Sequence, residues 1–266
     1  MTKDGLTIIK NENYSLIIIN DLTIKLTQLI KKNLSSICYG HAKSKTSRLA
    51  YAYKNTLNEF LERYNKKKKD TQKGMIGELL SHVLIQEYFP TWNTVSPYFN
   101  LEEKSIKKGF DLVLYSLEDK ELWITEVKSG ELHKDKDANA TAEDLLYIAK
   151  YDLNGRLNEK NNTFWENAIN GASIAFDGYK DVKDAVIDIL GKISDSTILN
   201  QQKSTDRNVI LISNLFSDLK DSVQETTPAY CYEKYKKENI FKKIFIISIQ
   251  KGTYTKIFDF LVSESR

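Results

Sequence analysis

Two acidic residues and a lysine lie near the ends of a segment whose pattern predicts a β-hairpin. Residues 109–128 (GFDLVLYSLEDKELWITEVK) carry Asp111 close to one end and Glu126 and Lys128 close to the other. If the tip lies at residues 118 and 119, Asp111 faces Glu126 across the hairpin, with Cβ atoms roughly 5 Å apart. Because side chains alternate along a strand, Lys128 projects from the same face as Glu126. Two facing carboxylates repel each other unless a proton or cation lies between them, so the arrangement predicts a divalent metal site.

The turn of this hairpin leaves its register open. Glu118-Asp119 is not the Asn-Gly or Asp-Gly pair that fixes a two-residue turn, and a loop with an odd number of residues would place the acids on opposite faces. An alternative interpretation is that both acids are solvated charges at strand ends. The strands argue against it, because apolar residues occupy both of their faces, as in interior strands that are covered on two sides. These residues are Phe110, Leu112, Val113, Leu114 and Tyr115 in the first strand and Leu122, Trp123, Ile124 and Val127 in the second.

A third acidic residue precedes the hairpin on a predicted helix. Residues 71–89 (TQKGMIGELLSHVLIQEYF) have apolar side chains at helical spacing, and Glu78 lies at the margin of this stripe with His82 one turn further on. A glutamate in this position is usually solvated, and a histidine there is usually a packing residue. Gly74 and Gly77, however, each cost a helix interior roughly 1 kcal/mol relative to alanine. They predict that this turn lies close to another backbone or to a ligand, which favours a functional role for Glu78.

These residues resemble a known nuclease signature. Glu78, Asp111 and the tripeptide 126–128 (EVK), in that order on helix, strand and strand, resemble the PD-(D/E)xK nuclease superfamily. Phe110 takes the place of the proline that commonly precedes the first strand acid. Three longer segments (GMIGELLSHVLIQEYF, SPYFNLEEKSIKKGFDLVLY and LWITEVKSGELHKDK) resemble the HamA family, DUF1837, the nuclease-like subunits of Hachiman anti-phage defence systems. The resemblance is strongest over about residues 72–155.

The resemblance implies a DNA nuclease with an α/β, restriction-endonuclease-like core, in which a central mixed sheet is flanked by helices and carries helical elaborations. It also implies a superfamily 2 helicase subunit, HamB, as the partner that holds the nuclease in check until DNA damage or phage replication. We therefore expect a single nuclease-fold domain over residues 1–266, with its catalytic core at about 71–158. An N-terminal strand and helices (1–70) and a C-terminal region of helices and strands (159–266) would flank this core.

The residue types are those of metal-assisted phosphodiester hydrolysis. We expect Asp111, Glu126 and the backbone carbonyl of Val127 to bind Mg²⁺ or Mn²⁺, and Glu78 to complete the site directly or through water. Few protein ligands suffice, because Mg²⁺ prefers hard oxygen ligands and retains several waters. Lys128 would orient the attacking water or stabilise the pentavalent phosphorus; alternatively, it forms only an ion pair with Glu126 or Asp111. The predicted catalytic residues are Glu78, Asp111, Glu126 and Lys128.

Basic residues gather around the predicted site. Lys107 and Lys108 immediately precede the first acid, and Lys134 and Lys136 follow the second strand. We expect all four to contact DNA phosphates, which position a duplex without reading its sequence. A run of four lysines at residues 66–69 either contributes to this surface or is a solvated linker between helices.

Length and composition set broad limits. The 266 residues are 41% hydrophobic, which suffices for a sizeable core, and the net charge of +3 does not by itself indicate nucleic-acid binding. No apolar run reaches the roughly 20 residues of a membrane-spanning helix, and the N-terminus does not resemble a signal peptide. Cys38 and Cys231 lie far apart without metal-binding spacing, so we expect reduced thiols in a cytoplasmic protein with no membrane contact.

Outside the hairpin, hydrophobic periodicity predicts further helices and strands. A strand at Tyr14–Asn20 should lead into a helix that Asp21 caps and that extends to about Ser36. Residues 256–262 fit either a strand or a terminal helix. Further helices are expected at 47–66, 142–157, 163–176 and 181–193, and further strands at 209–215 and 243–250.

The leading interpretation is a Mg²⁺-dependent DNA nuclease that acts in anti-phage defence with a helicase. The alternative is a catalytically silent nuclease-fold module that binds DNA and the helicase, although a binding module has no need for facing carboxylates. A stand-alone restriction endonuclease would require sequence-specific recognition, for which no interleaved aromatic and basic residues are present. The sequence has no GxxxxGK[ST] segment that would indicate an ATPase, and His41, His82 and His133 lack HExxH spacing.

Overall fold

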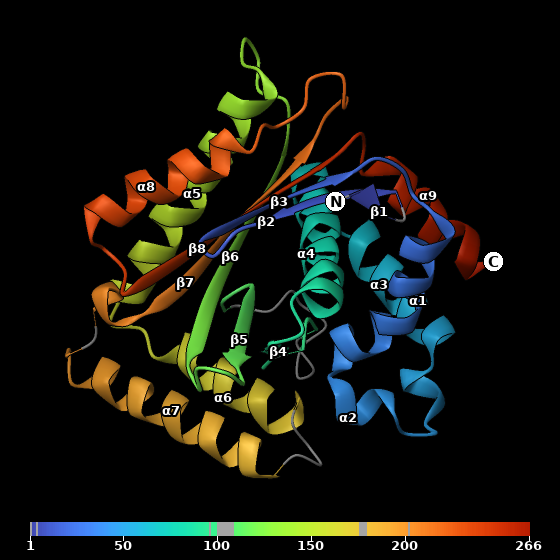
Figure 1. Cartoon of the computed structure of the whole chain (residues 1–266). Helices are drawn as coiled ribbons and strands as arrows, with labels where there is room; N and C mark the ends of the chain where they lie inside the picture. The colour runs from blue at the N-terminus through green and yellow to red at the C-terminus, as the bar shows by residue number, and fades with distance from the viewer. Residues whose placement is uncertain (1, 4, 96, 100–108, 176–179, 202) are drawn as a thin grey trace.

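A mixed β-sheet runs through the centre of the molecule (Figure 1). The computed structural model describes residues 2–3, 5–95, 97–99, 109–175, 180–201 and 203–266. In these ranges, eight strands pair in the order β1-β2-β3-β8-β7-β6-β5-β4. Their bounds are β1 (Thr2–Lys3), β2 (Leu6–Lys10), β3 (Tyr14–Ile19), β4 (Trp92–Thr94), β5 (Leu112–Ser116), β6 (Leu122–Glu131), β7 (Asn208–Phe216) and β8 (Lys243–Lys251).

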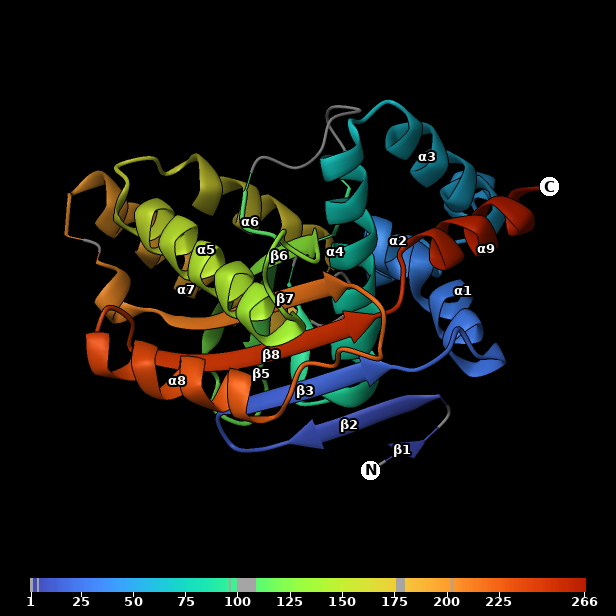
Figure 2. The same ribbon diagram turned by 90° about the horizontal axis from the view of Figure 1, so that it is seen from above.

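The middle strands of this sheet are parallel and the outer strands are antiparallel. β3 pairs with β8, β8 with β7, and β7 with β6, all in parallel. The outer pairs β1–β2, β2–β3, β4–β5 and β5–β6 are antiparallel. Figure 2 shows β2, β3, β8 and β7 lying side by side. The predicted α/β fold with a central mixed sheet is confirmed to this level.

Helices cover both faces of the sheet (Figure 1). Apolar side chains of α1, α3, α4 and α9 form a core against one face, and those of α5, α6, α7 and α8 form a second core against the other. The α-helices are α1 (Ile24–Tyr39), α2 (His41–Ser44), α3 (Tyr53–Asn65), α4 (Lys69–Tyr88), α5 (Ala138–Asn158), α6 (Thr163–Ala175), α7 (Lys180–Ile198), α8 (Thr226–Glu238) and α9 (Thr255–Ser265), and the 3-10 helices are η1 (Leu49–Tyr51) and η2 (Ser204–Asp206).

The hairpin β5–β6 has the predicted register. Leu112 pairs with Thr125 in its antiparallel ladder. Extended by one residue, this register places Asp111 opposite Glu126. Ser116 N–H donates to Glu121 O at 2.9 Å, so these two residues also face each other and four residues, 117–120, lie between them. Because this number is even, both acids lie on one face of the sheet.

The hairpin is also buried on both faces, as its sequence predicts. Every residue of β5 is buried. Leu114 and Trp123 pack in the core that includes α4, whereas Val113 and Ile124 pack in the core that includes α5. At the end of this buried hairpin, Glu126 is fully buried and Asp111 is half-buried.

Helix α4 approaches the sheet very closely at Gly77. A Cβ atom there would lie 1.9 Å from Ser129 Oγ and 3.3 Å from Asn214 Cβ, so only glycine fits. Asn214 Nδ2 donates hydrogen bonds to Gly77 O at 3.3 Å and to Ser81 Oγ at 3.0 Å, which hold the helix at this distance. The predicted close approach is confirmed for Gly77 and is wrong for Gly74, where an added Cβ would meet nothing within 4 Å.

Some predicted elements need correction. Thr23 caps α1 instead of Asp21, because Thr23 Oγ1 accepts the hydrogen bond from Leu26 N–H at 3.3 Å. The predicted helix at residues 47–66 is divided into η1 and α3, since the backbone is extended at Ala52 with ψ of 148°. Residues 256–262, which fit either a strand or a helix by sequence, are helical and form most of α9. Strand β2 and helix α8 were not predicted.

The two cysteines are free and buried. Burial raises the pKa of the Cys38 thiol and of the Cys231 thiol, which makes both poor nucleophiles. No helix in the described part of the chain is both long enough and apolar enough to cross a membrane.

Candidate active site

The two acids of the hairpin are held together by the backbone of β6. Asp111 lies just before β5, and its Oδ2 accepts a hydrogen bond from the backbone N–H of Val127 at 2.7 Å. Glu126 is 0% exposed and projects, like Ile124, toward the face that α5 covers. The structure thus places both carboxylates at one end of the hairpin, as the cross-strand register predicts.

Arg156 forms a bidentate ion pair with Glu126. Its Nη1 lies 2.8 Å from Glu126 Oε2, and its Nη2 lies 2.9 Å from Glu126 Oε1. The Glu126 side chain is 1% exposed and that of Arg156 is 26% exposed. Two parallel charge-assisted hydrogen bonds of this kind fix the plane of the carboxylate as well as its charge.

Lys128 is held between two carboxylates. Its Nζ lies 2.8 Å from Glu126 Oε1 and 2.8 Å from Asp152 Oδ2. Asp152 and Arg156 are four residues apart on α5, so they project from the same side of this helix toward β6. Sequence reasoning missed both residues. The only signal in the chain is an acid and a base spaced i,i+4 on the helix that follows the motif strand.

The charges of this cluster shift the titration of its members. Burial, followed by the nearby charge of Asp111, raises the pKa of Glu126 to about 7, against the opposing effects of Arg156 and Lys128. Burial lowers the pKa of Lys128, but Glu126 and Asp152 outweigh it, so the net shift is upward. Lys128 is therefore an ammonium ion at neutral pH and acts as a fixed positive charge rather than a base.

Glu78 lies on the other side of the sheet from Arg156 and Lys128. It is partly buried on α4, which packs against the face opposite α5. Burial raises the pKa of Tyr98, and the charges of Glu78 and Asp111 both add to this effect, which places the two acids within electrostatic range of one phenol. Among the described residues, no three Asp, Glu, His or Cys side chains are grouped closely enough to hold a metal ion. The role of Glu78 as a ligand stays a prediction.

Nearly the whole chain, including these residues, matches one protein family. A profile of the HamA family matches residues 5–261 of the 266-residue chain. The chain belongs to the HamA family. HamA membership gives it a role in Hachiman anti-phage defence. A comparison with curated proteins gave no match.

Of the four lysines predicted to contact DNA in this HamA chain, two can be placed. Lys107 and Lys108 lie outside the described residues. Lys134 is exposed in the loop that follows β6. Lys136 Nζ lies 2.6 Å from Asp144 Oδ2 on α5, so this lysine is already paired with a carboxylate. Lys134 is therefore the better candidate for a phosphate contact.

The histidines occupy other positions. His133 Nδ1 lies 2.9 Å from Asp144 Oδ2, which anchors the loop after β6 to α5. The buried ring of His82 packs edge-on against Tyr98, with 5.8 Å between the ring centroids. The position of His82 agrees with the packing role that is usual for such a histidine.

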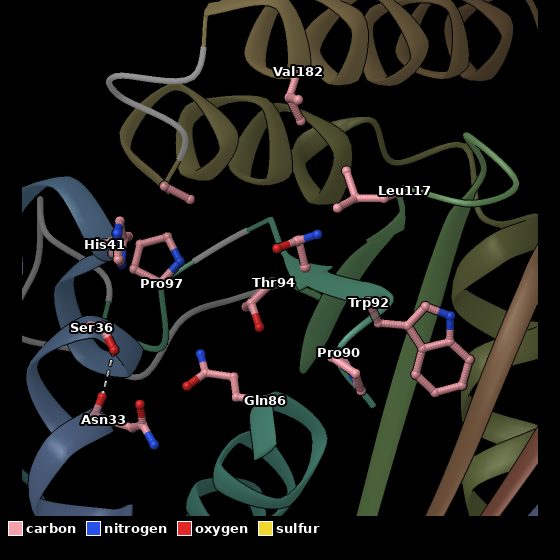
Figure 3. A pocket seen from close by; sticks show the side chains of 13 residues that line it. Asn33, Ser36, His41, Gln86, Pro90, Trp92, Thr94, Pro97, Leu117 and Val182 are labelled. Carbon is pink, nitrogen blue, oxygen red and sulfur yellow. Dashed lines mark hydrogen bonds between the residues drawn. The ribbon is translucent and has the colours of Figure 1, made fainter. Parts of the chain in front are cut away.

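A pocket of about 570 Å³ lies away from the acids, between α1, α4 and β4 (Figure 3). Asn33, Gln86 and Thr94 contribute polar groups to its wall. None of its described lining residues is Asp, Glu, Lys or Arg. Its wall lacks the charges that phosphodiester chemistry needs, so the hairpin end remains the candidate site.

Proposed function

We propose that this chain is a Mg²⁺-dependent DNA nuclease with a PD-(D/E)xK-type core. In this proposal it is the effector subunit of a Hachiman system and acts with a helicase subunit. The convergence of Asp111, Glu126 and Lys128 at one end of the central hairpin is the observation that most supports it. Membership of the HamA family supports the defence role.

The proposed ligands supply carboxylate and carbonyl oxygens, the donor type that a small, hard cation prefers. Asp111 and Glu126 are adjacent like charges, and the charge of Asp111 raises the pKa of Glu126. A divalent cation held by these residues would relieve this repulsion and favour both charged forms. The carbonyl of Val127 and the carboxylate of Glu78 would complete the ligand set with water. When bound, the metal would lower the pKa of a bound water and neutralise charge on the scissile phosphate.

Lys128 would stabilise the charge that develops on the phosphate. Its ammonium group is fixed by Glu126 and Asp152, each 2.8 Å away, so little reorganisation is needed when the reaction proceeds. Because Lys128 stays protonated, it would not accept the proton of the attacking water. Lys134 would hold a neighbouring phosphate and contribute no sequence preference.

One observation favours a second function. Arg156 contacts both oxygens of Glu126, as in a purely structural ion pair. On this reading the charged cluster stabilises the end of the sheet, and the chain is a catalytically silent module that binds DNA and the helicase. Point variants that keep the shape of the cluster separate the two functions.

The test is cleavage of supercoiled plasmid by the purified chain in Mg²⁺, with and without its helicase and ATP. Glu126→Gln keeps the side-chain shape, and Lys128→Ala removes the ammonium group. Each should slow cleavage about 10²–10³-fold, which is typical for the loss of one electrostatic contribution to a transition state. Glu118→Gln is the matched control, because it removes an exposed acid from the opposite end of the same hairpin.

The outcomes distinguish the two functions. Loss of cleavage in the Glu126 and Lys128 variants, with DNA binding retained, supports the nuclease. DNA and helicase binding without any Mg²⁺-dependent cleavage supports the silent module. Cleavage by the Lys128→Ala protein at the wild-type rate would falsify the assignment of nuclease chemistry to this motif.

A further inference from the structure

We propose that Arg156 competes with the divalent cation for Glu126, so that the site exchanges an arginine side chain for a metal ion when it becomes active. This inference rests on the proposed nuclease function, and it assigns the last turn of α5 a regulatory part in it. The closed pair of Arg156 and Glu126 would then be the resting form of the site.

The first support is the occupancy of the Glu126 oxygens. Oε1 receives Arg156 Nη2 at 2.9 Å and Lys128 Nζ at 2.8 Å, and Oε2 receives Arg156 Nη1 at 2.8 Å. A carboxylate oxygen has two lone pairs, so three of the four acceptor positions of Glu126 are filled and two of these belong to Arg156. A metal ion that binds Glu126 in a bidentate or bridging way must displace the guanidinium.

The second support is the position of Arg156 relative to solvent. The Glu126 side chain is 1% exposed, whereas Arg156 is 26% exposed and Lys128 is 23% exposed. A cation that enters from solvent therefore meets these two positive side chains before it meets the carboxylate. Arg156 Nη1 also lies 3.5 Å from Gly109 O, two residues before Asp111, so the guanidinium contacts the backbone next to one acid and the carboxylate of the other.

The third support is the charge of the cluster. With Glu126 ionised, as in its ion pair with Arg156, three carboxylates (Asp111, Glu126 and Asp152) and two cations (Lys128 and Arg156) leave a net charge of −1. A divalent cation added to this set gives +1, whereas a divalent cation that replaces Arg156 gives zero. Exchange is therefore favoured over simple addition where the cluster is buried.

The displaced guanidinium has another partner in the reaction. Phosphate and carboxylate both present a pair of oxygens that match the fork of an arginine side chain. Arg156 can thus leave Glu126 for a phosphate of bound DNA as the metal ion arrives. In that form it would touch the substrate, and until then it holds the site closed.

The experiment measures Mn²⁺ binding to the full-length chain without DNA, by electron paramagnetic resonance of the free ion. Arg156→Lys keeps the positive charge but loses the bidentate contact, so its Mn²⁺ affinity should rise about tenfold, as expected for one lost charge-assisted hydrogen bond. Glu126→Gln should lose the saturable site. Arg63→Lys is the matched control, because Arg63 contacts Glu59 within α3 and should leave Mn²⁺ affinity unchanged.

Each result decides the inference. Equal Mn²⁺ affinities of the wild-type and Arg156→Lys proteins, with the Glu126→Gln protein inactive in binding, overturn the competition and leave the nuclease proposal intact. Absence of saturable binding in every protein removes the metal site itself, and both proposals fail. If the Arg156→Lys protein does not fold, Mg²⁺ is titrated into the wild-type protein and the Arg156 side-chain N–H groups are followed by NMR. Displacement from Glu126 should make these protons exchange faster with water. An exchange rate that does not change with Mg²⁺ overturns the inference.

Discussion

Asp152 Oδ2 lies 2.8 Å from Lys128 Nζ, which ties a lysine of the central strand β6 to helix α5. The same ammonium group lies 2.8 Å from Glu126 on its own strand. Lys128 therefore depends on two different elements for its position. A strand alone leaves a long lysine side chain free to choose among many rotamers, and the helix removes this freedom.

Asp152→Asn should slow DNA cleavage roughly tenfold through its effect on Lys128. The variant loses a charge-assisted hydrogen bond but leaves the acids Asp111 and Glu126 in place. The loss should appear in kcat rather than in KM, because the proposed mechanism has Lys128 act on the transition state. Steady-state kinetics of plasmid cleavage test this. Asp188→Asn removes a comparable Asp–Lys pair on the exposed face of α7 and should have no effect.

Gly77→Ala should destabilise the protein by about 1–3 kcal/mol, the usual cost of overpacking. The added methyl group would lie 1.9 Å from Ser129 Oγ and 3.0 Å from Ser129 Cβ, so the hydroxyl must rotate and α4 must move slightly away from β6. Gly74→Ala is the matched control on the same helix, because it has open space and should be neutral or stabilising by up to about 1 kcal/mol. Urea unfolding of both variants measures the difference. Equal free energies of unfolding would show that α4 does not contact β6 as described.

Glu121 should make stability depend on pH at the start of β6. Its ion pair with Lys243, followed by that with Lys242, lowers its pKa below the ordinary 4.5 despite partial burial. The folded protein then holds this proton less tightly than the unfolded chain. The stabilising contribution is therefore complete above pH 4.5 and is lost as the pH falls through the lowered pKa.

Glu121→Gln should accordingly lower the free energy of unfolding by about 1 kcal/mol at pH 7. The difference from wild type should shrink below pH 4.5 and vanish once the pH has fallen through the lowered pKa. Thermal unfolding across this range measures it, with Glu118→Gln as the exposed control. A difference that stays constant down to low pH would mean that the two lysines do not stabilise Glu121.

Lys134→Ala should weaken DNA binding in a salt-dependent way. If the exposed lysine contacts one phosphate, the slope of log K against log salt should fall by up to about one. Fluorescence anisotropy with duplexes of different sequence measures the slope. Lys192→Ala, an exposed lysine on α7, is the control. An unchanged slope would place the DNA away from the loop after β6.

The sequence predicts the hairpin from local patterns, and it gives the observed register on the condition that the tip lies at residues 118 and 119. Apolar residues on both faces of β5 and β6 indicate interior strands, and an even loop places Asp111 opposite Glu126. The positioning residues Asp152 and Arg156 are different. They follow the motif strand by more than twenty residues, and their contacts depend on how α5 packs on the sheet, which helical periodicity does not specify.

The two glycines of α4 show the same limit. In the sequence both are glycines inside a predicted helix, and nothing distinguishes them. In the structure only Gly77 faces Ser129 and the sheet, whereas Gly74 lies at an open position. Rotation of the helix about its axis decides between them, and this rotation follows from packing across the whole core. The sequence therefore predicts that a close approach exists but cannot assign it to one residue.

The parallel pairing of β3 with β8 has a consequence for synthesis of the protein. β3 ends at Ile19, and its partner begins at Lys243, more than two hundred residues later. At roughly 5–20 residues per second, a ribosome needs about 10–45 s between the two. During this time, β3 and then β7 expose unpaired edges, which favour aggregation and proteolysis. Interrupted synthesis should thus yield fragments for degradation rather than a stable chain with an incomplete sheet.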